Sequence, residues 1–433
     1  MTYEEAVSYL EQHAGRGIRP GLGQIAGLLD LMGNPHLSFP VVHVTGSKGK
    51  SSVSRVVTAL AVAHGLTVGT YTSPHLESVE ERYAYNSVEA SPAEFAQAVA
   101  DTAAFDQLID DDPDTRLTYF EFATAVGFAW FAERAVELGV IEVGLGGRLD
   151  ATNVVESAVA VVASIALEHT EYLGDTLAEI ATEKAAILKP GGSLVTGSLP
   201  EEAKPVMAAR AKELGAPHLV YGRDFRLVDE VRAVGGWDIT IDGVYEQYDE
   251  IHIPVHGRHQ LENAAVAVAA TEELLGRALD ADAVREGFAT LTLPGRLEVV
   301  GRRPLTVIDG AHTPESMRAG SAALDEEFPP FLWKVVLGSL GDKKLDEIAA
   351  ALEGIAGEVF AVTAPSSRGV PAAEVAAAAR AALPECPVHE CGPVADGVQA
   401  AVLAAGEDGA VLVTGSMYLA GEARSLLTNT EKE

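Results

Sequence analysis

Cysteine is scarce in this sequence, and long apolar runs are absent. Four residues separate the two cysteines, Cys386 and Cys391, and the sequence has no second pair of cysteines. This pattern supports neither a disulfide framework nor a zinc site. No apolar stretch reaches the roughly 20 residues that span a bilayer, and the acidic start of the chain is unlike a secretory signal. We therefore expect a cytoplasmic protein with no membrane segment.

Basic residues are also few, and the chain is strongly negative. Asp and Glu number 63 against 31 Lys and Arg, which gives a net charge of −32. A polyanion would be repelled by this charge, so nucleic acid is not an expected partner. Any anionic ligand must be held by a local site rich in cations or N–H groups. A saline habitat and an ordinary acidic cytoplasmic protein would both explain the charge.

Length and composition predict two globular domains. Hydrophobic residues make up 48% of the 433 residues, and this length exceeds one ordinary domain of roughly 100–250 residues. The turn-rich segment Leu293-Pro294-Gly295 separates two series of short apolar runs. We therefore expect an ATP-binding domain with a substrate site at 1–293 and a second domain at 296–433.

Both series read as strands that alternate with helices. The first series comprises runs at 41–44, 67–71, 140–143 and 159–165, and a helix from Ser51 to about His64. The second comprises runs at 305–308, 334–337, 359–362 and 410–413, and an alanine-rich helix at 372–382. Runs without polar alternation are typical of parallel strands buried on both faces. The predicted class is α/β: a P-loop-type doubly wound, mainly parallel sheet, followed by a smaller Rossmann-like domain.

A glycine-containing loop follows the first predicted strand and leads into a helix. It reads Gly46-Ser47-Lys48-Gly49-Lys50-Ser51-Ser52. Its N–H groups would face a phosphate, Lys50 would add a positive charge, and Ser51 or Ser52 would offer a hydroxyl to magnesium. The full phosphate-loop motif needs glycine at position 44, where this chain has Val44, so a plain turn is the alternative. The flanking strand and helix favour a nucleotide site, of a ligase or a kinase.

Polar residues follow three other strands of the first series. Ser73 comes after the run at 67–71, Glu142 lies in the run at 140–143, and His169 follows the run at 159–165. The carboxyl ends of parallel strands meet at one edge of a sheet, where ligands bind. Oxygen ligands suit magnesium. Without further information, a turn cap for Ser73 and a structural histidine at 169 are the alternatives.

The glycine loop resembles the shortened loop of the Mur ligase superfamily. Segments 71–76, 118–122, 142–153 and 168–170 resemble its folylpolyglutamate synthase and dihydrofolate synthase branch, and the likeness covers nearly the whole chain. The resemblance implies ATP-dependent ligation of L-glutamate to a folate carboxylate through an acyl phosphate. We expect small-molecule substrates, one or two Mg²⁺ ions and a monomer.

The resemblance also implies a metal site and an unusual lysine. Ser51, Ser73, Glu142 and His169 would bind magnesium. Lys184, which would otherwise be a solvated helix lysine, would be carbamylated by carbon dioxide, so that a cation repelling the metal becomes an anion attracting it.

Further roles come from matches in the second half of the chain. Asn263 would contact the adenine end of ATP, Arg296 its phosphates, and Asp309 its ribose. His312 would lie near the incoming glutamate, whose carboxylates Arg368 and Ser416 would contact. The implied catalytic residues are Lys50, His169, Lys184, Arg296 and His312. A surface arginine after a turn is the alternative for Arg296.

A folate pocket is implied by three further segments. Its residues would be Gly21, Leu22, Tyr119, Phe120, Glu121, Phe122, Arg148, Leu149 and Asp150. Members that also use dihydropteroate usually carry an aspartate close to the position of Arg19 or Pro20, and this chain has none. Folate polyglutamylation is therefore the first expectation and dihydrofolate synthesis the second.

Two other functions stay open at this point. A cell-wall amino-acid ligase of the same superfamily usually has an additional N-terminal domain, and we expect none here because the glycine loop begins at Gly46. A nucleotide-binding regulator without catalysis is disfavoured by the presence of Glu142, His169 and Lys184 together. Glutamate-dependent release of ADP separates these possibilities.

Overall fold

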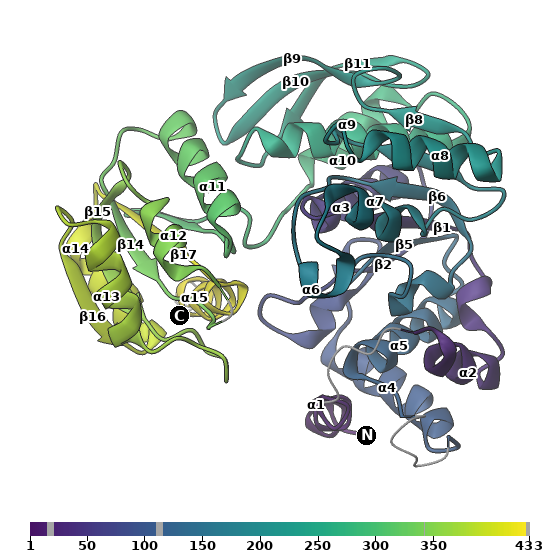
Figure 1. The fold of residues 1–433 in the computed structure, drawn as a ribbon, viewed down its shortest axis with the longest axis horizontal. Helices are drawn as coiled ribbons and strands as arrows, with labels where there is room; N and C mark the ends of the chain where they lie inside the picture. The colour runs from purple at the N-terminus through teal and green to yellow at the C-terminus, as the bar shows by residue number, and fades with distance from the viewer. Residues whose placement is uncertain (15–20, 110–115, 342, 430–433) are drawn as a thin grey trace. The chain divides into compact units, whose positions relative to one another are not determined.

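The computed structural model describes residues 1–14, 21–109, 116–341 and 343–429, and it divides into two compact units (Figure 1). Unit 1 comprises Met1–Ala233, Trp237–Pro254 and His259–Leu291, and unit 2 comprises Val234–Gly236, Val255–Arg258 and Thr292–Glu433. We keep 1–293 and 296–433 as proposed domain limits.

Unit 1 is built on an eight-stranded sheet in the order β4-β3-β2-β5-β1-β6-β7-β8. The strands are β1 (Val41–Thr45), β2 (Val68–Tyr71), β3 (Tyr83–Tyr85), β4 (Val88–Glu89), β5 (Leu138–Glu142), β6 (Ser157–Val162), β7 (Ser193–Thr196) and β8 (His218–Val220). Strands β2, β5, β1, β6, β7 and β8 are neighbours in that order and pair in parallel. Strand β3 pairs antiparallel with β2 and with β4. The predicted mainly parallel sheet is confirmed, and the antiparallel edge is an addition to it.

Helices cover both faces of this sheet (Figure 1). On one face α3 (Lys50–Ala63) packs against α9 (His259–Leu275) and α10 (Ala281–Ala289). Elsewhere α7 (Leu177–Ala185) and α8 (Lys204–Leu214) share a core with β6 and β7. A further core joins the sheet to α1 (Tyr3–Glu11), α2 (Gly23–Leu31), α4 (Pro92–Asp106) and α5 (Tyr119–Glu133). Burial of strands between helices explains why their sequences lack polar alternation.

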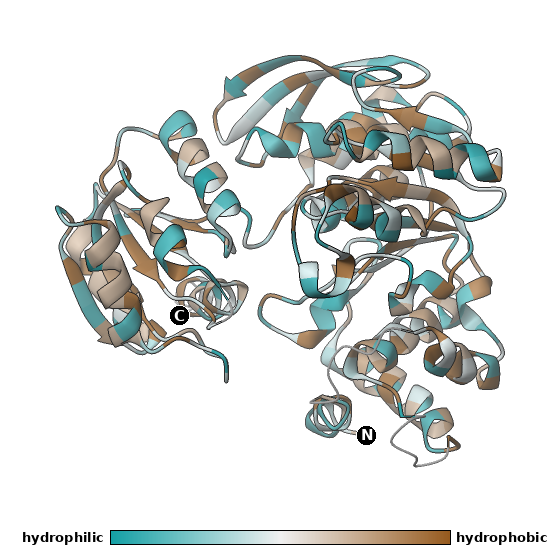
Figure 2. Ribbon diagram, viewed as in Figure 1, coloured by the Kyte–Doolittle hydropathy of each residue, from teal (hydrophilic) through white to brown (hydrophobic). Residues whose placement is uncertain are grey.

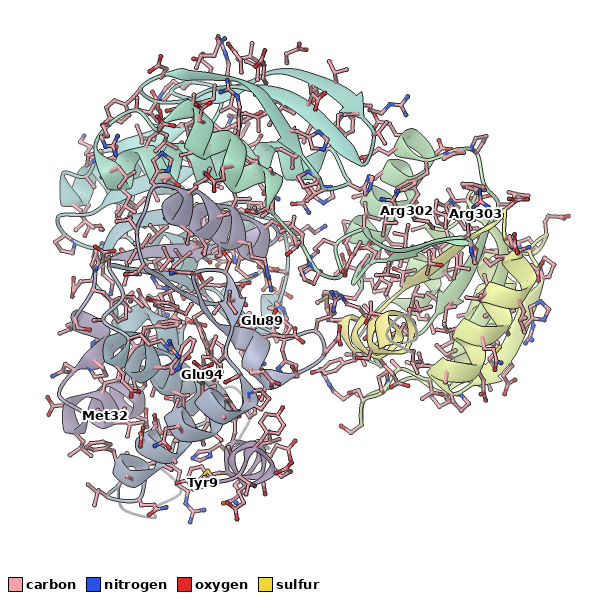
Figure 3. The ribbon with its side chains drawn as sticks, turned by 180° about the vertical axis from the view of Figure 1, so that it is seen from behind. Tyr9, Met32, Glu89, Glu94, Arg302 and Arg303 are labelled. Atoms are coloured by element: carbon pink, nitrogen blue, oxygen red, sulfur yellow. The ribbon has the colours of Figure 1, made fainter. Side chains whose placement is uncertain are left out.

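Side-chain hydrogen bonds start and fasten these helices. α5 begins with a capping box in which Thr118 and Glu121 satisfy each other's backbone N–H groups. α1 is tied to α4 by Tyr9, whose hydroxyl donates to Asp106 at 2.8 Å; Tyr9 is labelled in Figure 3. His13, just after α1, contacts the same carboxylate at 3.1 Å.

A small sheet of three strands was not predicted. It contains β9 (Arg226–Ala233), β10 (Gly236–Asp242) and β11 (Gln247–Ile253), of which β10 and β11 pair antiparallel. Polar and charged residues interrupt the apolar positions of these strands, so their sequence is typical of a loop. The buried Glu272 of α9 holds the hairpin, because it accepts hydrogen bonds from the Tyr248 hydroxyl (2.6 Å) and the Tyr245 backbone (3.3 Å).

Unit 2 contains a six-stranded sheet in the order β12-β13-β17-β14-β15-β16. The strands are β12 (Glu298–Arg302), β13 (Leu305–Ile308), β14 (Trp333–Leu337), β15 (Ala356–Val362), β16 (Val388–Gly392) and β17 (Ala410–Thr414). All neighbours are parallel except β12 and β13. Arg302 ends β12, and Arg303 lies in the turn between the two strands (Figure 3). The helices are α11 (Pro314–Glu327), α12 (Leu345–Ala350), α13 (Ala372–Ala382), α14 (Val394–Ala405) and α15 (Met417–Asn429). The Rossmann-like expectation is confirmed.

Hydropathy follows this layering, with hydrophobic strands at the centre of each sheet and mixed helices around them (Figure 2). Within the described ranges, no helix has the length and apolar character needed to cross a membrane. Cytoplasmic location and a monomeric state stay predictions.

The Tyr248 hydroxyl offers a test of what holds the small sheet. It donates to Glu272 and accepts from Leu279 N at 2.8 Å. We expect Tyr248→Phe to lower the free energy of unfolding of unit 1 by about 1–3 kcal/mol, because the Glu272 carboxylate and the Leu279 N–H each lose a hydrogen-bond partner. Urea unfolding measures this. The control Tyr245→Phe removes a hydroxyl from a half-exposed ring and should change stability little; equal losses in both variants would contradict the explanation.

Candidate functional site

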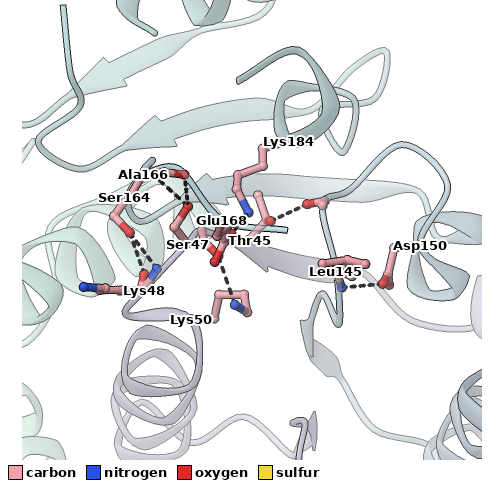
Figure 4. Close-up of polar contacts among 12 residues, drawn as sticks. Thr45, Ser47, Lys48, Lys50, Leu145, Asp150, Ser164, Ala166, Glu168 and Lys184 are labelled. Carbon is pink, nitrogen blue, oxygen red and sulfur yellow. Dashed lines mark hydrogen bonds and ion pairs between the residues drawn. The ribbon is translucent and has the colours of Figure 1, made fainter. Parts of the chain in front are cut away.

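The loop between β1 and α3 is fastened by the segment that follows β6 (Figure 4). Ser47 N donates to the Ser164 carbonyl at 3.0 Å, and Lys48 N donates to Ser164 Oγ at 2.8 Å. Ala166 N donates to Ser47 Oγ at 2.9 Å. These bonds also explain a corrected boundary: the strand predicted at 159–165 ends at Val162, because the following residues bond to the loop.

The backbone of this loop is shaped for an anion. Gly49 has a φ of 81° in the left-handed region, and α3 begins directly after it at Lys50. The first N–H groups of a helix have no partner within the helix and carry a partial positive charge. Lys50 bends back so that its Nζ donates to the Gly46 carbonyl at 2.9 Å. The loop therefore offers N–H groups and a cation at one place, as phosphate binding requires.

Asn263 of α9 lies against the loop. A Cβ atom placed on Gly49 would come within 2.5 Å of Asn263 Oδ1. The Asn263 amide also donates to Gln260 Oε1 at 3.0 Å, which fixes its orientation along α9. The two predicted nucleotide residues, far apart in the chain, are thus brought together.

Glu142 connects the loop helix to the end of β2. Its Oε1 accepts from Ser51 Oγ at 2.8 Å, and its Oε2 accepts from Ser73 N at 3.2 Å. The Glu142 side chain is almost fully buried at 1% exposure. Of the two serines of the glycine loop that could offer a hydroxyl to magnesium, Ser51 bonds to this carboxylate, while Ser52 is buried in α3. Three of the predicted metal residues are therefore neighbours.

His169 is placed differently from these three. It is exposed, has a φ of 44° and precedes the short helix α6 (Thr170–Leu173). The described residues contain no group of three or more His, Cys, Asp or Glu side chains that could hold a metal ion. The metal role of His169 stays a prediction.

Lys184 is buried at the end of α7 and is paired with Glu168 (Figure 4). Its Nζ donates to Glu168 Oε1 at 2.9 Å, and its exposure is 1%. Burial lowers the pKa of Lys184 to about 8, although Glu168 opposes this change, and Lys50 adds to it. The pKa of Glu168 is pushed up by burial, but Lys184 and Lys50 together lower it below its usual value. Glu168 was not among the predicted site residues, although it belongs to segment 168–170, which resembles the family, and precedes His169.

The segment after β5 is organised by Asp150. Its carboxylate accepts from Leu145 N at 2.8 Å and from both the backbone and the hydroxyl of Thr152. Burial raises the pKa of Asp150, and these hydrogen bonds partly offset that rise. Arg148 is exposed and pairs with Glu183 at 2.9 Å. Asp150 thus shapes the loop, and its predicted contact with substrate stays a prediction.

The start of α5 places the predicted aromatic residues in different surroundings. Tyr119 and Phe120 are half-buried, whereas Phe122 is fully buried and stacks on His13 with ring centroids 4.6 Å apart. Glu121 Oε2 completes the capping box, and its buried Oε1 has no hydrogen-bond partner within the described ranges. Phe122 is therefore part of the core.

Other predicted folate residues are less constrained. Leu149, Gly21 and Leu22 are half-buried, and Leu22 precedes α2. Residues 17–20, which precede Gly21 in the same predicted folate-binding loop, lie outside the described residues.

Unit 2 gathers its predicted residues at one edge of its sheet. Asp309 and His312 follow β13, Ser416 follows β17, and Arg368 follows β15, all at carboxyl ends of parallel strands. Gly415 N, just before Ser416, donates to the Ala311 carbonyl at 3.0 Å and joins two of these loops. Arg368 is exposed, while Ser416 is buried.

Asp309 and Arg296 interact within this unit. Burial raises the pKa of Asp309 to about 6, and the nearby Arg296 guanidinium opposes the change. Arg296 also donates to the Met417 sulfur at 3.0 Å, and the His312 ring contacts the Gly310 carbonyl at 2.8 Å. Arg296 is therefore held by neighbours of the sheet edge, unlike a free surface arginine.

Comparison with known proteins gives matches along most of the chain. Residues 44–271 match the Mur ligase middle domain, and residues 295–417 match the Mur ligase glutamate ligase domain. The dihydrofolate synthase/folylpolyglutamate synthase of Mycobacterium tuberculosis is 36% identical, over 94% of this chain and 90% of that protein. The folylpolyglutamate synthase of Lacticaseibacillus casei is 34% identical over 99% of both chains. The solved structure of Mycobacterium tuberculosis folylpolyglutamate synthase complexed with ADP has a TM-score of 0.92 at 35% identity and covers 98% of both chains.

The crowding at Gly49 predicts a defect in nucleotide binding. We expect Gly49→Ala to weaken binding of ADP at least about ten-fold, because the added methyl group displaces Asn263 and strains the left-handed backbone. Calorimetric titration with ADP and Mg²⁺ measures the affinity. Gly65→Ala is the control, since Gly65 has nearly the same φ of 85° but no atom within 4 Å of the added Cβ. Unchanged affinity in Gly49→Ala would contradict the assignment.

Proposed function

The chain belongs to the Mur ligase family, in its folylpolyglutamate synthase and dihydrofolate synthase branch, and we propose that it is an ATP-dependent ligase that joins L-glutamate to the carboxylate of a folate. The observation that carries this proposal is the convergence of Ser51 and Ser73 on buried Glu142, next to a loop shaped for phosphate. The predicted enzyme class is confirmed by the relatives.

The residues around Glu142 fit magnesium. The Glu142 carboxylate and the Ser51 hydroxyl are hard oxygen donors in contact with each other, and Ser73, whose backbone N–H bonds to Glu142, brings a second hydroxyl from a third segment of unit 1. When bound there, Mg²⁺ supplies neutralisation of the charge between the phosphate oxygens and the attacking carboxylate. We propose Ser51, Ser73 and Glu142 as the residues that hold it, with His169 as a further ligand.

The reaction divides into two steps. An oxygen of the acceptor carboxylate attacks the γ-phosphorus of ATP, and the bond from that phosphorus to the bridging oxygen breaks, which releases ADP and leaves an acyl phosphate. The glutamate amine then attacks the acyl carbon, loses a proton, and expels inorganic phosphate to leave an amide. The N–H groups after Gly49 and the Lys50 ammonium hold the phosphate oxygens and stabilise their charge.

For unit 2 we propose the roles that the family implies. Arg296 contacts the phosphates and Asp309 the ribose, while His312 lies near the incoming glutamate. Arg368 and Ser416 contact its carboxylates. Their placement at carboxyl strand ends of one sheet supports these roles.

Folate is the first acceptor proposed and dihydropteroate the second. The Mycobacterium tuberculosis relative carries both activities in its name, whereas the Lacticaseibacillus casei relative carries only the first. The half-buried rings of Tyr119 and Phe120 provide apolar surface of the kind that holds an aromatic ligand.

Release of ADP with different acceptors tests the proposed function. We expect glutamate-dependent release with tetrahydrofolate and slower or no release with dihydropteroate, and none with a cell-wall precursor. A coupled assay for ADP, with glutamate omitted as the control, measures this. Turnover with the cell-wall precursor alone would show that the substrate assignment is wrong.

We propose that Lys184 carries a carbamate in the active enzyme. Burial and a lowered pKa favour the neutral amine that reacts with carbon dioxide. The Nζ ammonium first loses one proton. Addition of carbon dioxide to the neutral amine then forms a C–N bond and releases a second proton, so that a cation next to Glu168 is replaced by an anion. Glu168 must then give up its ion pair with Lys184.

Carbon-13 NMR with labelled bicarbonate detects this group directly. We expect one carbamate signal that grows as the pH rises through about 8, because the neutral amine predominates above the pKa. Lys184→Ala should lack the signal and lose turnover, with partial rescue by a small added carboxylate. Lys189→Ala, which removes a half-buried lysine bonded to the Asn153 carbonyl, should keep the signal. A signal that persists in Lys184→Ala, or full activity of that variant, would refute the assignment.

A further inference from the structure

Arg82 is a buried cation that the proposed mechanism does not use. It is the last residue of a short helical turn, Val79–Arg82, and precedes β3. Only 7% of its surface is exposed. Among the described residues no carboxylate forms an ion pair with it. A buried charge without an opposite charge costs several kcal/mol, so its presence calls for an explanation.

The partners of Arg82 are neutral. Its Nε donates to His75 Nδ1 at 3.0 Å, and its guanidinium carbon lies 5.4 Å from the centre of the Tyr119 ring. An imidazole carries no negative charge, so His75 cannot neutralise the guanidinium. The phenol hydroxyl of Tyr71, which is also a neutral group, faces Arg82 as well.

The carboxylate next to Arg82 in the chain, that of Glu81, is hydrogen-bonded to backbone groups. Glu81 accepts hydrogen bonds from the backbone N–H groups of Leu76, Glu77 and Ser78, at 2.6–2.8 Å. It therefore closes the turn that carries His75. The five N–H groups of the guanidinium are not consumed by the contact with His75, and their planar arrangement matches a carboxylate.

Arg82 is also placed next to the acceptor side of the site. His75 is two residues after Ser73, whose backbone N–H bonds to Glu142. Tyr119, over which the guanidinium lies, belongs to the segment proposed to contact the folate. Thr72 N donates to the Arg82 carbonyl at 3.0 Å, which ties the Arg82 backbone to the end of β2.

We propose that Arg82 binds a carboxylate of the acceptor's tail and positions that tail beside Ser73 and Glu142. The inference rests on the proposed function, since it takes the acceptor to be an anion held in unit 1. Arg82 acts as a positioning residue: binding supplies the opposite charge that the guanidinium lacks, and the Tyr119 ring and His75 keep its plane in one orientation.

Binding of two acceptors to the full-length protein tests this role. The probes are tetrahydrofolate and its analogue with both tail carboxylates converted to carboxamides, titrated in the presence of ADP and Mg²⁺. We expect the wild-type protein to bind the acid at least about ten-fold more tightly than the amide. In Arg82→Met this preference should fall to less than about three-fold, while the affinity for ADP is unchanged. An undiminished preference in Arg82→Met would overturn the inference.

Matched variants separate this role from a structural one. Arg134→Met removes another arginine of unit 1 that packs on Trp130 and pairs with Glu94, and it should keep the full preference for the acid. If Arg82→Met does not fold, Arg82→Lys retains charge but not the planar fork, and it should raise KM for tetrahydrofolate at least about three-fold with KM for ATP unchanged. An unchanged KM for tetrahydrofolate in Arg82→Lys would also overturn the inference. Glutamate-dependent ADP release by the wild-type protein shows that the proposed function stands even if Arg82 plays no part in it.

Discussion

The carboxylate of Glu142 is the point on which the arrangement of unit 1 depends. It stands at the end of β5 and accepts hydrogen bonds from the start of α3 through Ser51 and from the end of β2 through Ser73. Because β2, β5, β1 and β6 are neighbours in the sheet, their carboxyl ends deliver four different loops to one edge. A buried carboxylate must be satisfied by such partners, so the chemistry of the site and the stability of the sheet edge are coupled.

Local charge opposes the charge of the whole chain at this edge. The protein carries a net charge of −32, yet the phosphate loop presents Lys48 and Lys50 together with the N–H groups of a helix start. Buried Lys184 pairs with half-buried Glu168 beside the loop, and the charge of Lys50 lowers the pKa of both groups. An anionic nucleotide is thus attracted by a small region, while the remaining surface repels polyanions.

Sequence patterns predicted the parts of the fold that obey simple rules. Short runs without regular polar alternation located β1, β2, β5 and β13, and glycine spacing located the loop before α3. The small sheet of β9 to β11 was missed because its strands mix charged and apolar residues and depend on Glu272, which is distant in the chain. The end of β6 was misplaced because Ser164 bonds to the phosphate loop, a contact between residues that sequence spacing cannot reveal.

The sequence allowed the type and position of most site residues to be predicted, but not which residues they contact. Glu142 and Lys184 were selected, whereas Glu168 and Arg82 were not. Only the folded chain shows that Glu168 pairs with Lys184, and that no carboxylate of the described residues pairs with Arg82. In the same way, the carboxylates of Glu121 and Asp150 are engaged by their own backbone loops, which a motif cannot show.

The central claim is that this edge activates a carboxylate by transferring phosphate to it. The most direct measurement labels both oxygens of the reacting acceptor carboxylate with ¹⁸O and analyses the released inorganic phosphate by mass spectrometry. If an acyl phosphate forms, one labelled oxygen passes to phosphate in each turnover and one stays in the amide product. Phosphate without label, released at the rate of amide formation, would contradict the account.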